Sequence, residues 1–183
     1  MKNFKLSRLL AAAALVACLS FTACKPAEDT TAQQLVIISA YNTMTKAQKI
    51  QLKGTWVDSG SWGNSYYKFT DDGLENYGDN YQSYAGNEIV FAPTSVDSGT
   101  AFIKYTRAAD ANGKYTTDPA LASDIGKWYA ISYKDLTATS VKISGAYKVS
   151  GKTSCATLEE AMLEFTVANG YFSIYSSCKR HSY

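Results

Sequence analysis

An alternation of apolar and polar residues with a period of two runs through most of the chain after residue 54. In one such segment, Ala101, Ile103 and Tyr105 share one face. Lys104 and Thr106 lie on the opposite face of the same segment. One covered face and one face in water are typical of strands in an antiparallel sheet. The alternation therefore predicts a mostly β domain built from short antiparallel strands.

Eight segments show this alternation or are rich in the tyrosine, threonine and valine that favour strands. The predicted strands are residues 55–58, 64–70, 74–77, 87–91, 100–107, 127–134, 140–148 and 171–176. Asp71-Asp72-Gly73 and Asn112-Gly113 are typical of hairpin turns. Short strands at this spacing predict a small antiparallel barrel or a sandwich.

Two helices are expected beside the strands. A capping box at residues 157–160 and an apolar stripe predict a C-terminal helix, which Asn169-Gly170 would end. The stripe consists of Leu158, Ala161, Met162 and Phe165. A second capping box, at residues 45–48, predicts a short N-terminal helix over 46–52.

The first 23 residues have the parts of an export signal. Residues 1–8 carry three basic side chains and no acid, and residues 9–23 are almost wholly apolar. A spanning helix needs about 20 apolar residues, so this run of 15 is too short to cross a bilayer. The sequence turns polar at Lys25, and residues 25–34 have the composition of a tether.

A cysteine stands at the polar boundary of this signal. Phe21-Thr22-Ala23-Cys24 resembles the lipobox of bacterial lipoproteins, in which a small residue precedes a cysteine that is acylated, for example with palmitate. The resemblance implies that Cys24 carries a lipid anchor. Cys18 is the alternative, although cleavage there would leave an apolar stub on the mature chain. Two or more acyl chains, at about 0.8 kcal/mol per buried methylene, attach a protein stably.

These features predict an exported protein that is lipid-anchored to the bacterial cell envelope, at the periplasmic or surface face of the outer membrane. The predicted organisation is a signal peptide (1–23), a lipidated tether with a short helical lead-in (24–52), an antiparallel β domain (53–178) and a tail (179–183). Without the signal, the chain keeps 15 basic and 16 acidic residues, a net charge of −1. This balance makes nucleic acid an unsuitable partner. We expect a monomer whose membrane contact is its anchor.

Two cysteines remain once the signal is removed and Cys24 is acylated. An even pair in an exported protein favours a disulfide between Cys155 and Cys178. Its loop would contribute about 3 kcal/mol in the chain-entropy model. The alternative is two buried thiols.

Side chains suited to catalysis or metal binding are scarce. The single histidine, His181, stands two residues from the C-terminus, where an imidazole is poorly held for a catalytic triad. A small acidic cluster lacks the spacing of a calcium loop; it consists of Asp71, Asp72, Glu75 and Asp79. We therefore expect no enzyme activity, no cofactor and no metal. A hydrolase with spatially paired carboxylates is the less favoured alternative.

Aromatic residues are the remaining indication of function, and the chain holds 14 tyrosines. Their plain interpretation is core packing on the strands. The alternative is an aromatic-lined cavity or surface that binds a small apolar ligand or a sugar. The candidate ligand-binding residues are Trp56, Tyr67, Phe69, Tyr105 and Trp128.

Gly54-Thr55-Trp56 resembles the Gly-x-Trp motif at the first strand of lipocalins. In that family the tryptophan closes one end of an eight-stranded up-and-down barrel, and an arginine covers it. The late helix before a short final strand is also similar to lipocalins. The resemblance implies a small lipocalin-like barrel. The sequence does not indicate which arginine would cover Trp56.

A second resemblance lies in residues 126–148 and 152–178, which are similar to the C-terminal half of a group of small spirochaete lipoproteins. That group has no assigned activity that can be carried over, so the resemblance bears on the location and the fold of this chain. We expect a non-enzymatic envelope protein whose barrel binds a small ligand or a partner. The alternative is a surface interaction protein, an adhesin or inhibitor, acting through loops such as 59–64 and 110–124. A cavity between the strands would favour the first hypothesis, and exposed aromatic side chains without a cavity the second.

Overall fold

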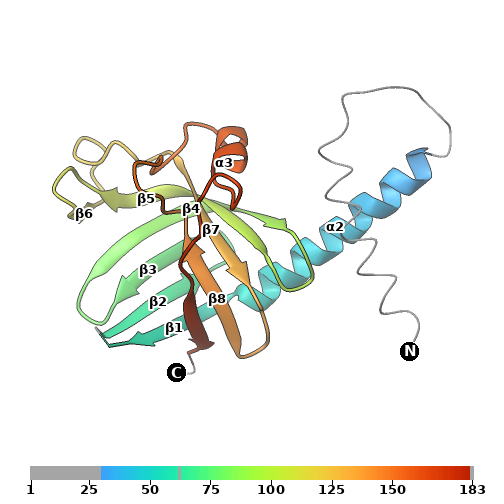
Figure 1. Cartoon of the computed structure of the whole chain (residues 1–183), viewed down its shortest axis with the longest axis horizontal. Helices are drawn as coiled ribbons and strands as arrows, with labels where there is room; N and C mark the ends of the chain where they lie inside the picture. Colours follow the sequence, from blue (N-terminus) through green and yellow to red (C-terminus); the bar gives the residue numbers. More distant parts are fainter. Residues whose placement is uncertain (1–29, 62, 182–183) are drawn as a thin grey trace.

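The computed structural model of the chain describes residues 30–61 and 63–181, and it is a β-barrel with a long helix at one end (Figure 1). The predicted export signal lies outside the described residues, as do both candidate lipidation sites, Cys18 and Cys24. None of the helices within the described ranges has the length and apolar character needed to span a bilayer.

Two helices and nine strands occur in the described part of the chain. In chain order they are α2 (Thr30–Leu52), β1 (Gly54–Gly60), β2 (Gly63–Phe69), β3 (Leu74–Gly78), β4 (Gln82–Pro93), β5 (Gly99–Ala109), β6 (Tyr115–Thr116), β7 (Trp128–Lys134), β8 (Ser140–Gly145), α3 (Leu158–Glu164) and β9 (Ser176–Arg180). The fold class predicted from the alternation, a mostly β antiparallel domain with a C-terminal helix, is confirmed.

Eight of these strands close into a barrel. Each strand pairs antiparallel with its neighbour in the order β1, β2, β3, β4, β5, β7, β8 and β9, and β9 returns to β1 through the pair Trp56–Arg180. Strand β6 pairs only with β5 and stays outside the ring. The continuous ring of pairs decides between the two architectures predicted from the sequence, in favour of the barrel.

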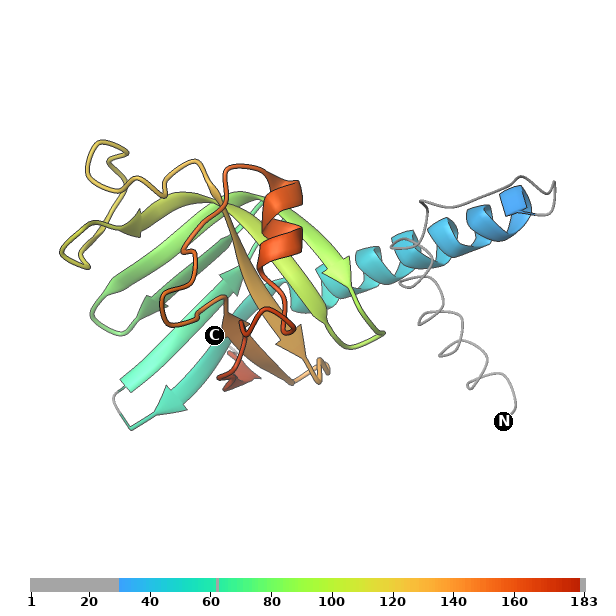
Figure 2. The ribbon, with the colours of Figure 1, turned by 45° about the horizontal axis from the view of Figure 1, so that its top comes forward.

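The barrel has two different ends (Figures 1 and 2). At the helix end lie the C-terminus of α2, the start of β1, the end of β9 and the turns after β2, β4 and β7. At the loop end lie the turns after β1 and β3 and the long connections after β5 and β8. Helix α3 belongs to the connection after β8 and contacts β5 and β7.

Helix α2 is longer than the sequence analysis predicted. It spans 23 residues and begins at Thr30, inside the segment expected to be a tether. The capping box at residues 45–48 is not a helix start. The Thr45 hydroxyl donates to the Tyr41 carbonyl at 2.8 Å, so it bonds back along the helix instead of capping an N-terminus. The prediction of a short N-terminal helix over 46–52 was therefore wrong in its length.

Helix α3 forms where its capping box predicts it. The Thr157 hydroxyl accepts from the Glu160 amide at 3.2 Å. The helix ends at Glu164, earlier than the predicted stop at Asn169-Gly170, because the chain turns there and the Asn169 side chain donates to the last helical carbonyls, those of Leu163 and Glu164. Ala161 is fully buried. From the predicted apolar stripe, however, Met162 is exposed.

The final strand is displaced from its predicted position, residues 171–176. Tyr171 and Phe172 are buried in an irregular segment, where the Tyr171 ring packs edge-on against Phe165 at 5.1 Å. The strand that closes the barrel, β9, begins only at Ser176. The aromatic residues that predicted a strand here instead pack the connection between β8 and β9 against the barrel.

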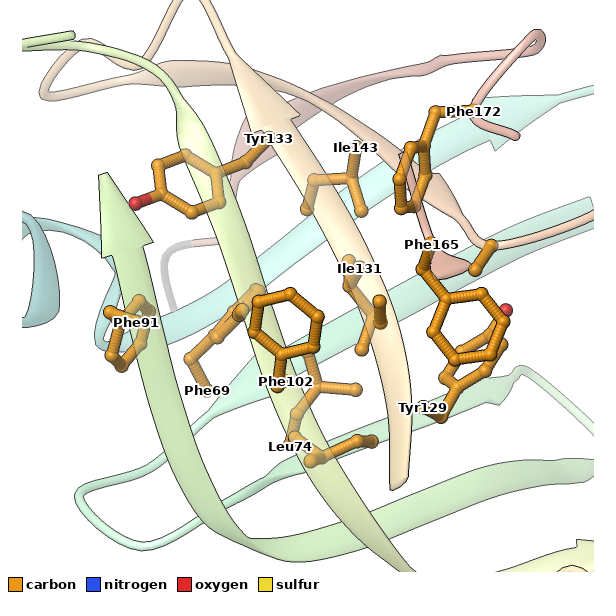
Figure 3. Close-up of a cluster of buried hydrophobic side chains, with 14 of the residues drawn as sticks. Phe69, Leu74, Phe91, Phe102, Tyr129, Ile131, Tyr133, Ile143, Phe165 and Phe172 are labelled. Carbon is orange, nitrogen blue, oxygen red and sulfur yellow. The ribbon is translucent and has the colours of Figure 1, made fainter. Parts of the chain in front are cut away.

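The barrel interior is filled by its own side chains (Figure 3). Strand β1 contributes Trp56, and β5, β7 and β8 contribute Ile103, Ile131 and Ile143, all fully buried. Two tyrosines take the space that neighbouring glycines leave. A Cβ on Gly99 would lie 2.5 Å from the Tyr133 hydroxyl, and a Cβ on Gly145 would overlap the Tyr129 hydroxyl. The tyrosine rings therefore fill the lumen as packing groups.

Candidate functional surfaces

The Gly-x-Trp segment joins the helix to the barrel. Trp56 is fully buried, and its indole N–H donates to the Leu52 carbonyl at 2.7 Å. The guanidinium of Arg180 lies over the Trp56 ring, 4.2 Å from its centroid, which is cation–π geometry. Arg180 also donates to the carbonyl oxygens of Gln51 and Lys53. Trp56 and Arg180 together satisfy the carbonyls at the C-terminus of α2, where positive charge is favourable.

The glycine of this motif is required by its backbone and by Arg180. Gly54 has a φ of +121°, and a Cβ there would lie 2.9 Å from Arg180 Nη1. Arg180 is the arginine that the sequence could not assign, since residues 179 and 180 were placed in the tail. They belong to β9. Ser176, Cys178 and Arg180 are spaced with a period of two, and this spacing was the one sequence feature that could have indicated the strand.

A buried polar contact also connects α2 to the barrel. Gln48 is 1% exposed; its Nε2 donates to the Ser95 carbonyl at 2.6 Å, and its Oε1 accepts from the Tyr133 hydroxyl. Burial raises the pKa of Tyr133, so the hydroxyl stays protonated and donates. This network and the Trp56–Arg180 contact close the helix end.

The five candidate ligand-binding residues lie in or against the packed core. Trp56, Phe69 and Tyr105 are buried, and Tyr67 and Trp128 are half-buried. Tyr105 stacks on Tyr129 at 4.9 Å, so its ring face is covered by another ring. Every buried side-chain N or O atom among the described residues has a hydrogen-bond partner. This placement fits core packing better than it fits a ligand cavity.

The predicted disulfide between Cys155 and Cys178 was wrong, and both cysteines are buried free thiols. Cys155 pairs with Trp128 at the first residue of β7, whereas Cys178 lies opposite Val141, beyond the last residue of β7. The length of β7 thus separates them by about 20 Å, far more than the roughly 7 Å between Cα atoms that a bridge tolerates. Two cysteines flanking a helix in sequence need not meet in space.

Three of the four acidic residues singled out in the sequence are held by separate partners. Asp71 pairs with Lys53, and Glu75 with Arg107 Nη2 at 2.9 Å. Asp79 accepts from the Tyr66 hydroxyl at 2.9 Å. Among the described residues, no group of three or more His, Cys, Asp or Glu side chains is arranged for a metal ion.

His181, expected in the tail, is held against the barrel. Its backbone N–H donates to the Thr55 carbonyl at 2.8 Å, and its ring meets the Tyr66 ring edge-on at 5.6 Å. This contact extends the β1–β9 seam by one more hydrogen bond and places the imidazole on the outer face of β2.

The connection between β8 and β9 carries several exposed apolar side chains, which are together called the α3 surface here. Among the described residues, it includes half of the twelve exposed large hydrophobic side chains. Its members are Tyr147, Val149, Met162, Leu163, Val167 and Ile174. Lys148 stands between two members of this surface; its ammonium is over the Tyr171 ring at 5.3 Å, and a Cβ on Gly170 would lie 3.7 Å from its Cδ, so residues 147–149 lie beside residues 170–171.

An open depression of about 440 Å³ lies at the turn between β3 and β4, at the loop end. It is lined by Glu75, Tyr77, Gly78, Asp79, Asn80, Tyr81 and Gln82. Glu75 and Asp79 stand out in the sequence as acids, but residue spacing does not show the β3–β4 register that brings them beside the two tyrosines.

Comparisons of the chain with models of protein families, with curated proteins and with solved structures find no match.

Proposed function

We propose that this chain is a lipid-anchored protein of the bacterial envelope that binds a protein partner on the outside of its barrel, without enzymatic activity. The observation that carries the proposal is the α3 surface. The anchor rests on the lipobox at Cys24, with Cys18 as the alternative, and on the export signal before it. Helix α2, about 35 Å long, then leads from the anchored side of the chain to the barrel.

The packed lumen favours the hypothesis of a protein partner over that of a small apolar ligand. The hydroxyls of Tyr133 and Tyr129 lie against Gly99 and Gly145 of the neighbouring strands, and the core side chains are buried against one another. A small-ligand site is usually a pocket that encloses most of its ligand. The barrel interior has the character of a protein core, so binding is assigned to the outer surface.

The exposure of the α3 surface supports this assignment. Leu163 is 72% exposed, Val167 70% and Val149 76%, although each could have been polar without affecting the core. Residues 147–149 lie beside residues 170–171, and apolar side chains exposed together on a protein surface mark interaction sites. Burying such area stabilises a complex by about 25 cal/mol per Å² before the costs of association.

Site-specific photo-crosslinking tests the proposed surface. Benzoylphenylalanine at Val167 is expected to crosslink one defined protein in cells that make this chain. The same probe at Val96, 56% exposed but at the helix end, is the matched control and should not. Adding Leu163→Asp to the Val167 probe should abolish the crosslink, with unchanged thermal unfolding. Equal crosslinking from both positions, or none from Val167, contradicts the proposal.

Palmitate labelling tests the anchor separately. The wild-type chain should incorporate label, Cys24→Ala should lose it, and Cys18→Ala should keep it. The reverse pattern would assign the anchor to Cys18, and no label in the wild type would refute lipidation.

A further inference from the structure

The β3–β4 depression combines fixed aromatic rings with fixed polar groups, and neither serves the barrel core. We propose that it is a binding site for a saccharide unit of a glycan, with Tyr81 as the stacking surface and Asp79 as a hydrogen-bond acceptor. The site is distinct from the α3 surface and shares no residue with it, so each proposal can be refuted without affecting the other.

The two rings are held in place without being buried. Tyr81 is 56% exposed, yet its ring lies directly against Gly78, where a Cβ would overlap the ring carbons. Tyr77 stacks on Tyr66 with centroids 5.0 Å apart and planes within 15°. An exposed aromatic ring that packing has already ordered loses little entropy on binding. The depression therefore offers a preorganised apolar surface.

The polar groups of the depression are also oriented by their neighbours. Asp79 accepts from the Asn64 backbone N–H at 3.2 Å and from the Tyr66 hydroxyl at 2.9 Å. These hydrogen bonds lower the pKa of Asp79, so it is a carboxylate acceptor at neutral pH. Glu75 and Gln82 are both held by Arg107, whose side chain is only 11% exposed.

This combination matches the chemistry of a sugar ring. A pyranose has an apolar C–H face, which packs on an aromatic ring, and a rim of hydroxyls, which donate to carboxylates and amides. The lining residues include carboxylates and amides but no lysine, arginine or histidine, so a phosphate or other anion is disfavoured. The volume lies in the usual range for small-ligand sites, and the open shape admits one unit of a longer chain.

Binding to an array of immobilised oligosaccharides tests the proposal. The array carries oligomers of N-acetylglucosamine, glucose, galactose and mannose, and the full-length protein is the analyte. We expect retention of at least one oligomer, followed by titration of that oligomer in solution. Tyr81→Ala should weaken this binding about fivefold to tenfold, since one aromatic contact is lost. Asp79→Asn should weaken it through loss of the charged acceptor.

Matched controls separate binding from folding. Tyr147→Ala removes another exposed tyrosine, 66% exposed against 56% for Tyr81, from the α3 surface and should leave sugar binding unchanged. Thermal unfolding should be the same for Tyr81→Ala and the wild type, and Gly78→Ala, which displaces the ring, should reproduce the binding loss. The proposal is overturned if no oligomer is retained more strongly by the wild type than by Tyr81→Ala. It is also overturned if free choline binds at this site and no saccharide does, because that would assign the rings to a quaternary ammonium.

Discussion

Replacing Gln48 tests how much the buried polar network at the helix end contributes to the stability of the protein. Replacing Gln48 with Leu leaves the Tyr133 hydroxyl without its acceptor and the Ser95 carbonyl without the Gln48 donor. A buried polar group that loses its partner costs about 1–3 kcal/mol. Because Ser95 is only half-buried, we expect Gln48→Leu to lower the free energy of unfolding by about 2–4 kcal/mol. That is a large part of the 5–15 kcal/mol typical of a domain.

The magnitude is tested with a double-mutant cycle measured by urea unfolding. Tyr133→Phe alone should lower the free energy of unfolding by about 1–2 kcal/mol, since it leaves the Gln48 side-chain oxygen without a donor. The double variant Gln48→Leu/Tyr133→Phe removes both partners, so it should be less destabilised than the sum of the single variants by about 1–2 kcal/mol. Gln51→Leu, the same change one turn away on a half-buried side chain, is the control and should alter stability little.

Strict additivity of the two single variants would refute this reasoning, because it would mean that Gln48 and Tyr133 do not share an interaction. An equal loss in Gln51→Leu would show that the cost comes from leucine on α2 and not from the network. A changed dependence of the unfolding free energy on urea would mean that the variants alter the surface exposed, and the cycle would then not isolate the contact.

Four further outcomes are expected. Arg180→Ala should lower the unfolding free energy by about 1–3 kcal/mol in thermal or urea unfolding, and lysine should restore only part, since one ammonium cannot replace a guanidinium that both stacks and donates to several carbonyls. Gly145→Ala should cost about 1–3 kcal/mol by overlap with the Tyr129 hydroxyl, and Tyr129→Phe in the same chain should recover part of that loss. Burial raises the pKa of the Cys178 thiol from its ordinary value of 9.0 to about 12, so its contribution to stability is full below pH 9 and is lost as pH rises from 9 to 12; Cys178→Ala should flatten this loss in urea titrations. Peptide mapping without reductant should recover Cys155 and Cys178 as alkylated free thiols, and a linked peptide would contradict the structure.

The sequence predicted the parts of the fold that depend on local periodicity. Strands β1, β2, β3, β5 and β7 form within a few residues of their predicted bounds, and α3 begins at its capping threonine. These elements are marked by patterns that a few neighbouring residues carry. The same local information located Gly54 and Trp56 at the start of the barrel.

The remaining features depend on contacts between distant residues. Strand β9 has a weak strand sequence, and it forms because β1 and β8 offer it two edges. Residues 171–176 have a strong strand sequence, but Tyr171 and Phe172 are buried in an irregular segment, with the Tyr171 ring against Phe165. The positions of Cys155 and Cys178 at opposite ends of β7 likewise follow from the register of the barrel, which spacing along the chain does not encode.

The candidate site on the β3–β4 turn was missed for a related reason. Gly78 and Tyr81 look like ordinary hairpin residues in the sequence. They form part of the candidate site because the Tyr81 ring packs against Gly78, and this contact depends on the conformation of the turn. Arg107, which orients Glu75, is 32 residues away from it along the chain.

The seam between β1 and β9 sets how the molecule would respond to mechanical force. The chain enters β1 from α2 at the helix end, while a partner on the α3 surface would pull on the segment that enters β9 at the loop end. The two strands would then be drawn in opposite directions along their length. Because the bonds of an antiparallel pair run across the strands, such a load is carried in shear by the pairs of Trp56 and Val57 with β9 together. Arg180, stacked on Trp56 and hydrogen-bonded to the Gln51 carbonyl of α2, would resist the separation of β1 and β9.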